Sequence, residues 1–130
     1  MRSAICGFLS ILAMTACLSF ATTDDDARAF AESVLTMKDN KQYKEMYRDK
    51  FHQSMQSQFT EEQWLAAAAQ VDRQTGAQKG RSLSTSDKSM GVYKFRYDTR
   101  CENGRAFDDI YVTNDGGWKV VGLWVRPNIQ

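Results

Sequence analysis

The chain has 130 residues, a length typical of one domain, and a formal net charge of +1. Residues 1–21 contain Arg2, one of the 17 basic residues, and none of the 16 acidic ones, so without them the net charge is zero. Phosphate binding needs surplus positive charge, which argues against nucleic acid as the main partner. Cys6 and Cys17 lie within residues 1–21, so Cys101 and the single histidine, His52, are not expected to form a cysteine-ligated zinc site, and no cofactor is predicted.

The amino terminus has the pattern of a secretory signal. Arg2 supplies a positive charge, residues 4–18 are almost wholly apolar, and Ser19 and Ala21 place small residues at −3 and −1 of a cleavage site. The pattern predicts a signal peptide over 1–21 and a mature domain over 22–130. The alternative is a lipoprotein signal over 1–16, because residues 14–17 resemble a lipobox with Cys17 as the lipidated residue. Either reading predicts a periplasmic or secreted protein, attached to a membrane only if Cys17 is lipidated.

Three helices are predicted in the first half of the mature chain. Residues 24–38 carry an apolar stripe, with Thr23 as the expected cap and three aspartates at the positive end of the helix dipole. Apolar residues recur every three or four positions over 41–55. A third helix is expected to begin with a capping box of Thr60 and Gln63, flanked by Phe59 and Trp64 as a hydrophobic staple, and to end at Gly76.

The second half alternates apolar and polar residues and predicts strands over 78–87, 91–102, 105–114 and 117–126. Asn103-Gly104 and Asp115-Gly116 are typical two-residue hairpin turns. The predicted fold class is therefore α+β, with three N-terminal helices packed on one face of a curved four-stranded antiparallel sheet.

These turns also predict the register of the sheet. A loop at 103–104 places Thr99 opposite Asp108 on an apolar inner face, and Asp98 opposite Asp109 on the outer face. A loop at 115–116 places Val121 opposite Ile110. The outer face is then expected to be rich in aromatic and basic side chains, which are frequent in protein interfaces. The residues predicted to bind a partner there are Arg96, Arg100, Phe107, Tyr111, Trp118 and Trp124.

Few residues suggest catalytic chemistry. Asp98 and Asp109 would form either a paired-carboxylate site or a solvated set of ion pairs with the neighbouring arginines. Asp108 on the inner face is either a hydrogen-bonded structural carboxylate or a pocket base acting with His52. Cys101 is expected to be a buried, unreactive thiol.

The order of elements, the helical Trp64-Leu65 segment, Gly76 and the strand at 115–122 (DGGWKVVG) resemble the nuclear-transport-factor-2-like, cystatin-like superfamily, and within it a small exported bacterial family. The likeness covers residues 24–126. It implies a curved sheet wrapping a long helix, a dimer through the sheet face in many relatives, and a cone cavity that is an active site in some relatives. Enzymatic relatives place Asp, His or Tyr in that cavity, and here only Asp108 and the tyrosines could do so. Small exported domains of this kind include immunity proteins that neutralise toxins.

The leading functional expectation is a non-enzymatic exported protein that binds a protein partner through its sheet face, as an immunity or inhibitor protein against an envelope-acting toxin. A small-molecule binder or hydrolase-like enzyme using a pocket around Asp108 is the first alternative. A structural envelope lipoprotein anchored through Cys17 is the second, and a homodimer through the sheet face is a further way to cover that face.

Overall fold

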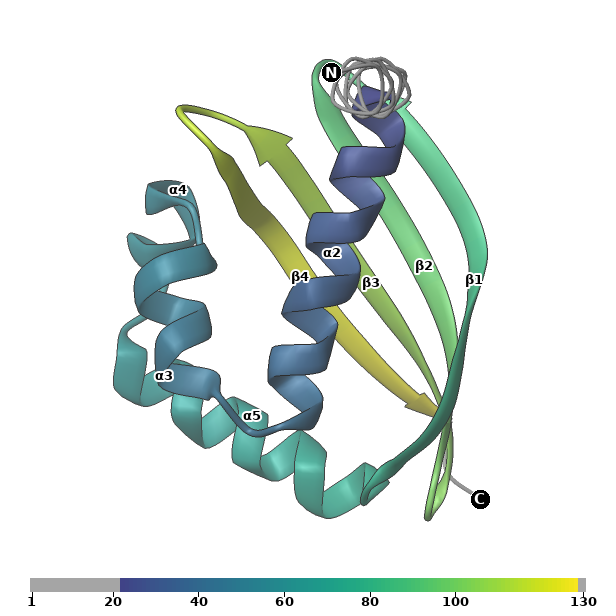
Figure 1. The fold of residues 1–130 in the computed structure, drawn as a ribbon. Helices are drawn as coiled ribbons and strands as arrows, with labels where there is room; N and C mark the ends of the chain where they lie inside the picture. The colour runs from purple at the N-terminus through teal and green to yellow at the C-terminus, as the bar shows by residue number, and fades with distance from the viewer. Residues whose placement is uncertain (1–21, 129–130) are drawn as a thin grey trace, which may run out of the picture.

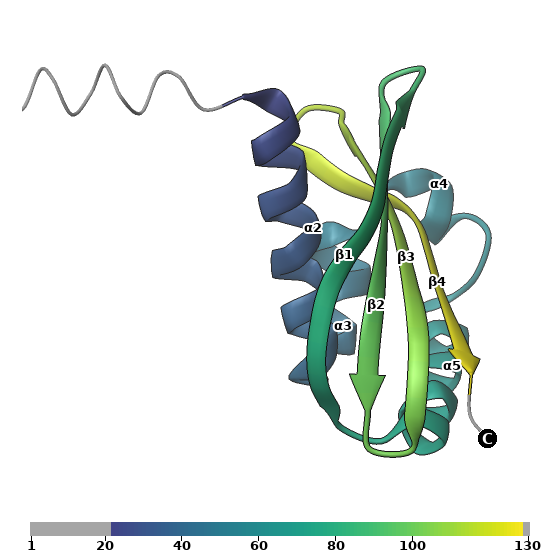
Figure 2. The ribbon, with the colours of Figure 1, turned by 90° about the vertical axis from the view of Figure 1, so that its right-hand side faces the viewer.

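The computed structural model describes residues 22–128, which form an α+β fold (Figure 1). The predicted signal peptide and the lipidation site at Cys17 lie outside the described residues. Four antiparallel strands, each beside its neighbour in sequence, form one open sheet in the order β1-β2-β3-β4. The strands are β1 (Gln78–Ser89), β2 (Val92–Cys101), β3 (Gly104–Asn114) and β4 (Trp118–Asn128). The sheet is strongly twisted when seen from the side (Figure 2).

Helix α2 (Thr23–Asp39) begins one residue earlier than expected. Its N-cap is Thr22, whose hydroxyl accepts a hydrogen bond from the backbone N–H of Asp25 at 3.1 Å, so the prediction of Thr23 as the cap is wrong. The Asp25 carboxylate accepts from the Thr22 N–H in return, which completes a capping box. The predicted stripe is confirmed in its buried members, Ala27, Ala31, Val34 and Leu35.

The prediction of one continuous helix over 41–55 is wrong. The segment contains α3 (Tyr43–Glu45), a π-helical turn η1 (Met46–Lys50), and then α4 (Gln53–Gln56). Between them Phe51 is extended and forms a parallel bridge with Val120, and the His52 N–H donates to the Val120 carbonyl at 2.8 Å. The chain leaves the helix because this pairing with β4 buries the Phe51 ring, which lies 4.8 Å from the Trp64 ring. Within residues 22–128 the chain therefore forms four α-helices and one π-helical turn, and not the three helices that were predicted.

Helix α5 (Glu61–Thr75) has the predicted ends. Thr60 and Gln63 form the expected capping box, and Gly76 ends the helix with a φ of 73°. Phe59 and Trp64, the expected staple pair, both pack on the ring of Phe51.

The β2–β3 turn is shifted from its predicted position. Its two loop residues are Glu102 and Asn103, so Cys101 pairs with Gly104, and every cross-strand pair moves by two residues. The shift has a tertiary cause, because the turn is bound to the α5–β1 connection: the Glu102 carboxylate accepts from the Ala77 N–H at 2.7 Å and the Asn103 N–H donates to the Thr75 carbonyl at 3.0 Å. A shift of two keeps each residue on its predicted face.

The shift changes which residues face each other. Asp109 lies opposite Arg96, and Asp98 lies opposite Phe107, so the predicted pairing of Asp98 with Asp109 is wrong. On the inner face, Asp108 pairs with Tyr97 rather than with Thr99. The paired-carboxylate site has no geometric basis in this register.

The β3–β4 register also differs, and here a bulge changes the face. Ile110 pairs with Leu123 instead of Val121, and a register shift between Tyr111 and Val112 leaves Val121 as the extra residue. A bulge reverses the alternation of the residues that precede it, so Trp118 lies on the inner face and not on the outer face as predicted, and Val120 lies on the inner face as well. Trp118 packs against Phe30 and Tyr93, and Val120 is fully buried.

The core lies between α2 and the inner face of the sheet. It is completed by side chains of η1, Phe51 and α4. Its fully buried members are Ala27, Ala31, Val34, Leu35, Met46, Ile110, Val112 and Val120. Within residues 22–128 no helix is both long and apolar enough to cross a membrane.

Candidate functional site

A cavity of about 530 Å³ lies between α5, the carboxyl end of α2 and the inner face of the sheet. Apolar side chains from three elements form much of its wall, namely Tyr43, Trp64, Val71, Leu123 and Val125. Charged groups form the remainder. Its volume is in the range of pockets that hold small molecules, and a few polar groups in an apolar wall are the usual composition of such pockets.

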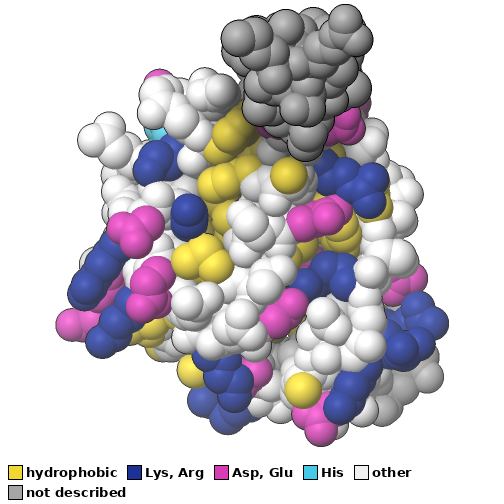
Figure 3. Space-filling view, viewed as in Figure 1, with side chains coloured by type: hydrophobic (Ala, Val, Ile, Leu, Met, Phe, Trp, Pro, Cys, Tyr) yellow, Lys and Arg dark blue, Asp and Glu magenta, His cyan; other side chains and the backbone are white. Residues whose placement is uncertain are grey.

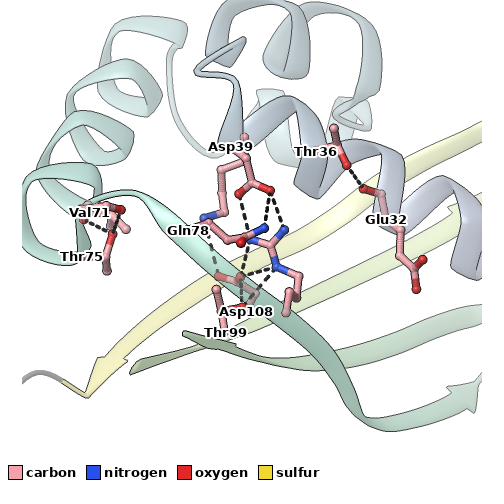
Figure 4. A network of polar contacts seen from close by, with 11 residues as sticks. Glu32, Thr36, Asp39, Val71, Thr75, Gln78, Thr99 and Asp108 are labelled. Atoms are coloured by element: carbon pink, nitrogen blue, oxygen red, sulfur yellow. Dashed lines mark hydrogen bonds and ion pairs between the residues drawn. The ribbon is translucent and has the colours of Figure 1, made fainter. Parts of the chain in front are cut away.

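The charged part of the wall is a cluster centred on Asp108 (Figure 4). The Asp108 side chain is about 1% exposed. Its Oδ2 accepts a hydrogen bond from the Thr99 hydroxyl at 2.7 Å and another from Arg81 Nε at 3.1 Å. The Arg81 guanidinium also donates two hydrogen bonds to the Asp39 carboxylate, at 2.7 and 2.9 Å. Lys38 Nζ lies 3.7 Å from Asp108 Oδ1. The cluster therefore joins two carboxylates and two cations and is neutral overall.

Four elements supply these groups. Lys38 and Asp39 end α2, Arg81 lies on β1, Thr99 on β2 and Asp108 on β3. Arg81 pairs directly with Thr99 across β1 and β2, and Thr99 reaches Asp108 diagonally across β2 and β3. The sheet therefore places Arg81, Thr99 and Asp108 next to one another. The last turn of α2 packs over them, as Figure 4 shows for Asp39 above Asp108.

Arg81 is held in its charged form. Burial alone would lower the pKa of Arg81, but its hydrogen bonds to Asp39 and the negative charges of Asp39 and Asp108 raise it above its ordinary value. Arg81 is thus a permanent cation between two carboxylates. Two other groups on the cavity wall are shifted by their surroundings: burial raises the pKa of the Cys101 thiol and of the Tyr43 hydroxyl, so both stay protonated at neutral pH.

One atom of the cluster is unsatisfied. Asp108 Oδ1 is buried and has no hydrogen-bond partner among the described residues. Lys38 is too distant from it for a hydrogen bond, which requires about 3.2 Å or less. A buried acceptor without a donor costs roughly 1–3 kcal/mol, more when it is charged. This oxygen is therefore a place where a donor from a bound molecule would be favourable.

His52 is not part of the cavity. Its Nδ1 accepts from the Ser54 N–H at 3.0 Å and caps α4, and its Nε2 lies 2.6 Å from an oxygen of Asp115 in the β3–β4 turn. Asp108 is seven residues from Asp115 along β3, a span of about 23 Å at 3.3 Å per residue. The predicted pairing of Asp108 with His52 is therefore wrong.

The prediction that Asp108 is an inward-facing carboxylate with hydrogen-bond partners is confirmed, and Thr99 is one of them. The residues that sequence reasoning missed are Lys38, Asp39 and Arg81. The only feature of the local sequence that could have indicated them was the charged pair Lys38 and Asp39 at the end of the first predicted helix. Nothing in the alternation of β1 marked Arg81 as inward-facing.

The outer face of the sheet carries five of the six residues predicted to bind a partner. Arg96 forms two hydrogen bonds with the buried Asp109 carboxylate, at 2.7 and 2.9 Å, and lies over the Phe107 ring at 5.0 Å. The Tyr111 and Trp124 rings meet edge to face at 4.9 Å. Arg100 lies at the turn end of this face, where it pairs with Arg105. The sixth residue, Trp118, belongs to the inner face.

Within the described residues, no group of three or more His, Cys, Asp or Glu side chains is arranged to hold a metal ion. Comparison of the chain with curated proteins and with solved structures gives no match. A family model described as "Protein of unknown function (DUF4019)" matches residues 30–123, which contain the core of the sheet, α5 and all the cavity's charged residues from Lys38 to Asp108. The chain therefore belongs to the DUF4019 family of proteins of unknown function.

Proposed function

We propose that this protein is a non-enzymatic binding protein that takes a small molecule into the cavity beside Asp108. The observation that carries the proposal is the buried Asp108 Oδ1, an acceptor on the cavity wall to which no group of residues 22–128 donates a hydrogen bond. Keeping a charged cluster on an otherwise apolar inner face is costly for stability. Local violations of folding rules of this kind are expected at functional sites.

The charges of the cluster restrict the ligand. Lys38 and Arg81 already balance Asp39 and Asp108, so an ammonium placed at Oδ1 would lie close to two cations. A carboxylate there would meet a second carboxylate. The group that suits Oδ1 is a neutral donor, such as a hydroxyl or an amide N–H. The remaining wall, with Trp64 and the apolar side chains of β4, suits an apolar or aromatic body.

The same groups favour binding over catalysis. Asp108 Oδ2 is occupied by hydrogen bonds from Arg81 and Thr99, and the neighbouring carboxylates raise the pKa of Arg81 and hold it as a cation. Cys101 stays a protonated thiol because burial raises its pKa. His52 is bound to Asp115 at the far end of β3. The side chains at the cavity are therefore suited to orienting a ligand rather than to moving a proton.

We propose that the protein is exported and binds its ligand outside the cytoplasm. The charged start, apolar run and small residues of 1–21 support export. The intact mass of the protein isolated from the envelope of its host tests this part. A chain beginning at Thr22 or a lipid-bearing Cys17 supports export, and an unprocessed chain in the cytoplasm contradicts it.

Two neighbouring alanines on α5 allow a matched test of the cavity. Ala67 lines the cavity and Ala66 does not, and both are exposed. Ala67→Trp should fill the cavity, whereas Ala66→Trp adds the same indole outside it. The probes are three sets of aromatic fragments that differ in one group: a hydroxyl or amide, an amine, and a carboxylate. Binding is measured by saturation-transfer NMR and by the shift in melting temperature.

We expect the neutral hydroxyl and amide fragments to bind best. Ala67→Trp should weaken them at least tenfold, while Ala66→Trp stays within twofold of the wild type. If the charged fragments bind best, or if both tryptophan variants lose binding equally, the proposal is wrong.

A further inference from the structure

The outer face of the sheet is uncovered in the described part of the chain. Helices α2 and α5 lie on the opposite side (Figures 1 and 2), and the core residues of β2, β3 and β4 point toward them. On the uncovered side, Phe107 is 37% exposed and Trp124 is 46% exposed. Apart from Met90 in a turn, these are the large hydrophobic side chains most exposed among the described residues. Both therefore offer apolar surface to a partner.

The two aromatic side chains are held in place before any partner arrives. The Trp124 indole lies over Gly122, where an added Cβ would come within 2.5 Å of the ring, and its edge contacts Tyr111. Phe107 lies beneath the guanidinium of Arg96, which is itself fixed by two hydrogen bonds to Asp109. Rigid aromatic and arginine side chains lose little entropy on binding, and such residues are typical energetic centres of protein interfaces.

The outer face carries more positive than negative charge. Its acidic side chains are already satisfied: Asp109 is bound by both Arg96 and Arg126, and Asp98 is bound by Arg105. Lys94 and Arg100 form no ion pair within the described residues. Lys119 also lies opposite the outward-facing Thr113, but its ammonium donates to the Asp49 carbonyl of η1 and is left out of the count. By the strand register, five other cationic and three acidic side chains point outward between the turns, a surplus of two positive charges: Lys94, Arg96, Arg100, Arg105 and Arg126 against Asp87, Asp98 and Asp109. By contrast, cationic and acidic side chains are interspersed on the helix side (Figure 3).

We infer that the outer face, centred on Phe107 and Trp124, docks an acidic segment of another protein. Carboxylates of the partner would meet Lys94 and Arg100, and an apolar side chain would pack between the two aromatic rings. A second copy placed face to face would bring two positive surfaces together, which is unfavourable. Nucleic acid fits less well, because the whole chain has a net charge of only +1. This inference is independent of the cavity.

The test uses the purified protein and a displayed library of random 12-residue peptides. We expect selection to enrich peptides that combine several Asp or Glu residues with at least one aromatic or aliphatic residue. The dissociation constants of the selected peptides are then measured by fluorescence anisotropy against two charge-reversed variants. One carries Lys94→Glu with Arg100→Glu on the outer face, and the other carries Lys44→Glu with Arg73→Glu on the helices.

Both variants change the net charge by the same amount, so only the position of the change differs. The outer-face variant should bind at least tenfold more weakly, and the helix variant should stay within twofold of the wild type. Melting curves show that each variant is folded, and Arg100→Glu alone serves if the double variant is not. Trp124→Ser should also weaken binding at least tenfold.

Three results would overturn the inference. The first is selection of peptides without an acidic excess, or binding that the outer-face variant does not change. The second is a dimer of the wild type in light scattering that Trp124→Ser converts to a monomer, which would assign the face to a second copy. The third is tighter binding of a 20-nucleotide oligothymidylate than of any selected peptide, with the same dependence on Lys94 and Arg100.

Discussion

Replacing Arg81 with methionine tests whether the buried cluster is held together by charge. Arg81→Met keeps the length of the side chain but removes two hydrogen bonds to Asp39, one to Asp108 and one to the Thr99 hydroxyl. Asp108 is then left about 1% exposed with Thr99 as its only donor and Lys38 at 3.7 Å. Breaking a buried ion pair by removing one partner costs about 3–5 kcal/mol, because the other charge stays buried.

Urea unfolding measures this loss. With an m-value of about 2 kcal/mol/M for a small domain, the midpoint should fall by about 1.5–2.5 M. Arg100→Met is the matched control, since Arg100 is exposed and forms no ion pair in the described chain, and its effect should stay within about 0.5 kcal/mol. A loss below about 1 kcal/mol for Arg81→Met would refute the idea that the cluster depends on its charges.

A double variant separates the cost of the buried charge from the cost of lost packing. If Arg81→Met destabilises because Asp108 is left charged and unpaired, adding Asp108→Asn should recover about 1 kcal/mol or more, since residues in one network couple by roughly 0.5–3 kcal/mol. If the losses of the two single variants simply add, the Arg81 side chain stabilises the protein by packing, and the electrostatic account is wrong.

Three further predictions concern the outer face, a helix cap and acid stability. Gly122→Ala should displace the Trp124 indole and raise its accessibility to acrylamide quenching, because the new Cβ would come within 2.5 Å of the ring. Thr22→Ala should lower stability by about 1 kcal/mol in urea unfolding, whereas Thr23→Ala should change it by less than about 0.5 kcal/mol, because only Thr22 caps α2. As the pH is lowered, the melting temperature of Glu32→Gln should fall less steeply than that of the wild type, because the native structure favours the charged form of Glu32.

The sign of the acid effect follows from the contacts of Glu32. Burial alone would raise its pKa, but hydrogen bonds from Arg28 and from the Tyr97 hydroxyl outweigh burial and lower it. A lowered pKa in the folded state contributes stability that is present above the unfolded value, roughly 4.3 for glutamate, and is lost as the pH falls through the folded value. The wild type should therefore lose more stability than Glu32→Gln below about pH 4.3. Equal slopes there would contradict this account, as would unchanged quenching in Gly122→Ala or equal losses in the two threonine variants.

The ends of α5 were predictable because the interactions that set them span only a few residues. The Thr60 and Gln63 capping box and the stop at Gly76 depend on backbone groups within four residues of each side chain. The alternation of β2 and β3 assigned each residue to its face, because a side chain changes face at every position of a strand. The second predicted helix failed because apolar residues at three and four positions cannot show that Phe51 pairs with β4.

The sequence by itself determined the α+β class, the antiparallel order of strands, the faces of β2 and β3, and the inward position of Asp108, because propensity, capping and alternation are properties of neighbouring residues. The tertiary structure decided the register, the face of Trp118 and the contents of the cavity. Each of these depends on groups far apart in the chain: Glu102 binds Ala77, a bulge opposite Tyr111 reverses β4, and Arg81 reaches Asp39 across 42 positions. Such contacts form only when the sheet and α2 are packed together, so local patterns could place Asp108 but not the partners that surround it.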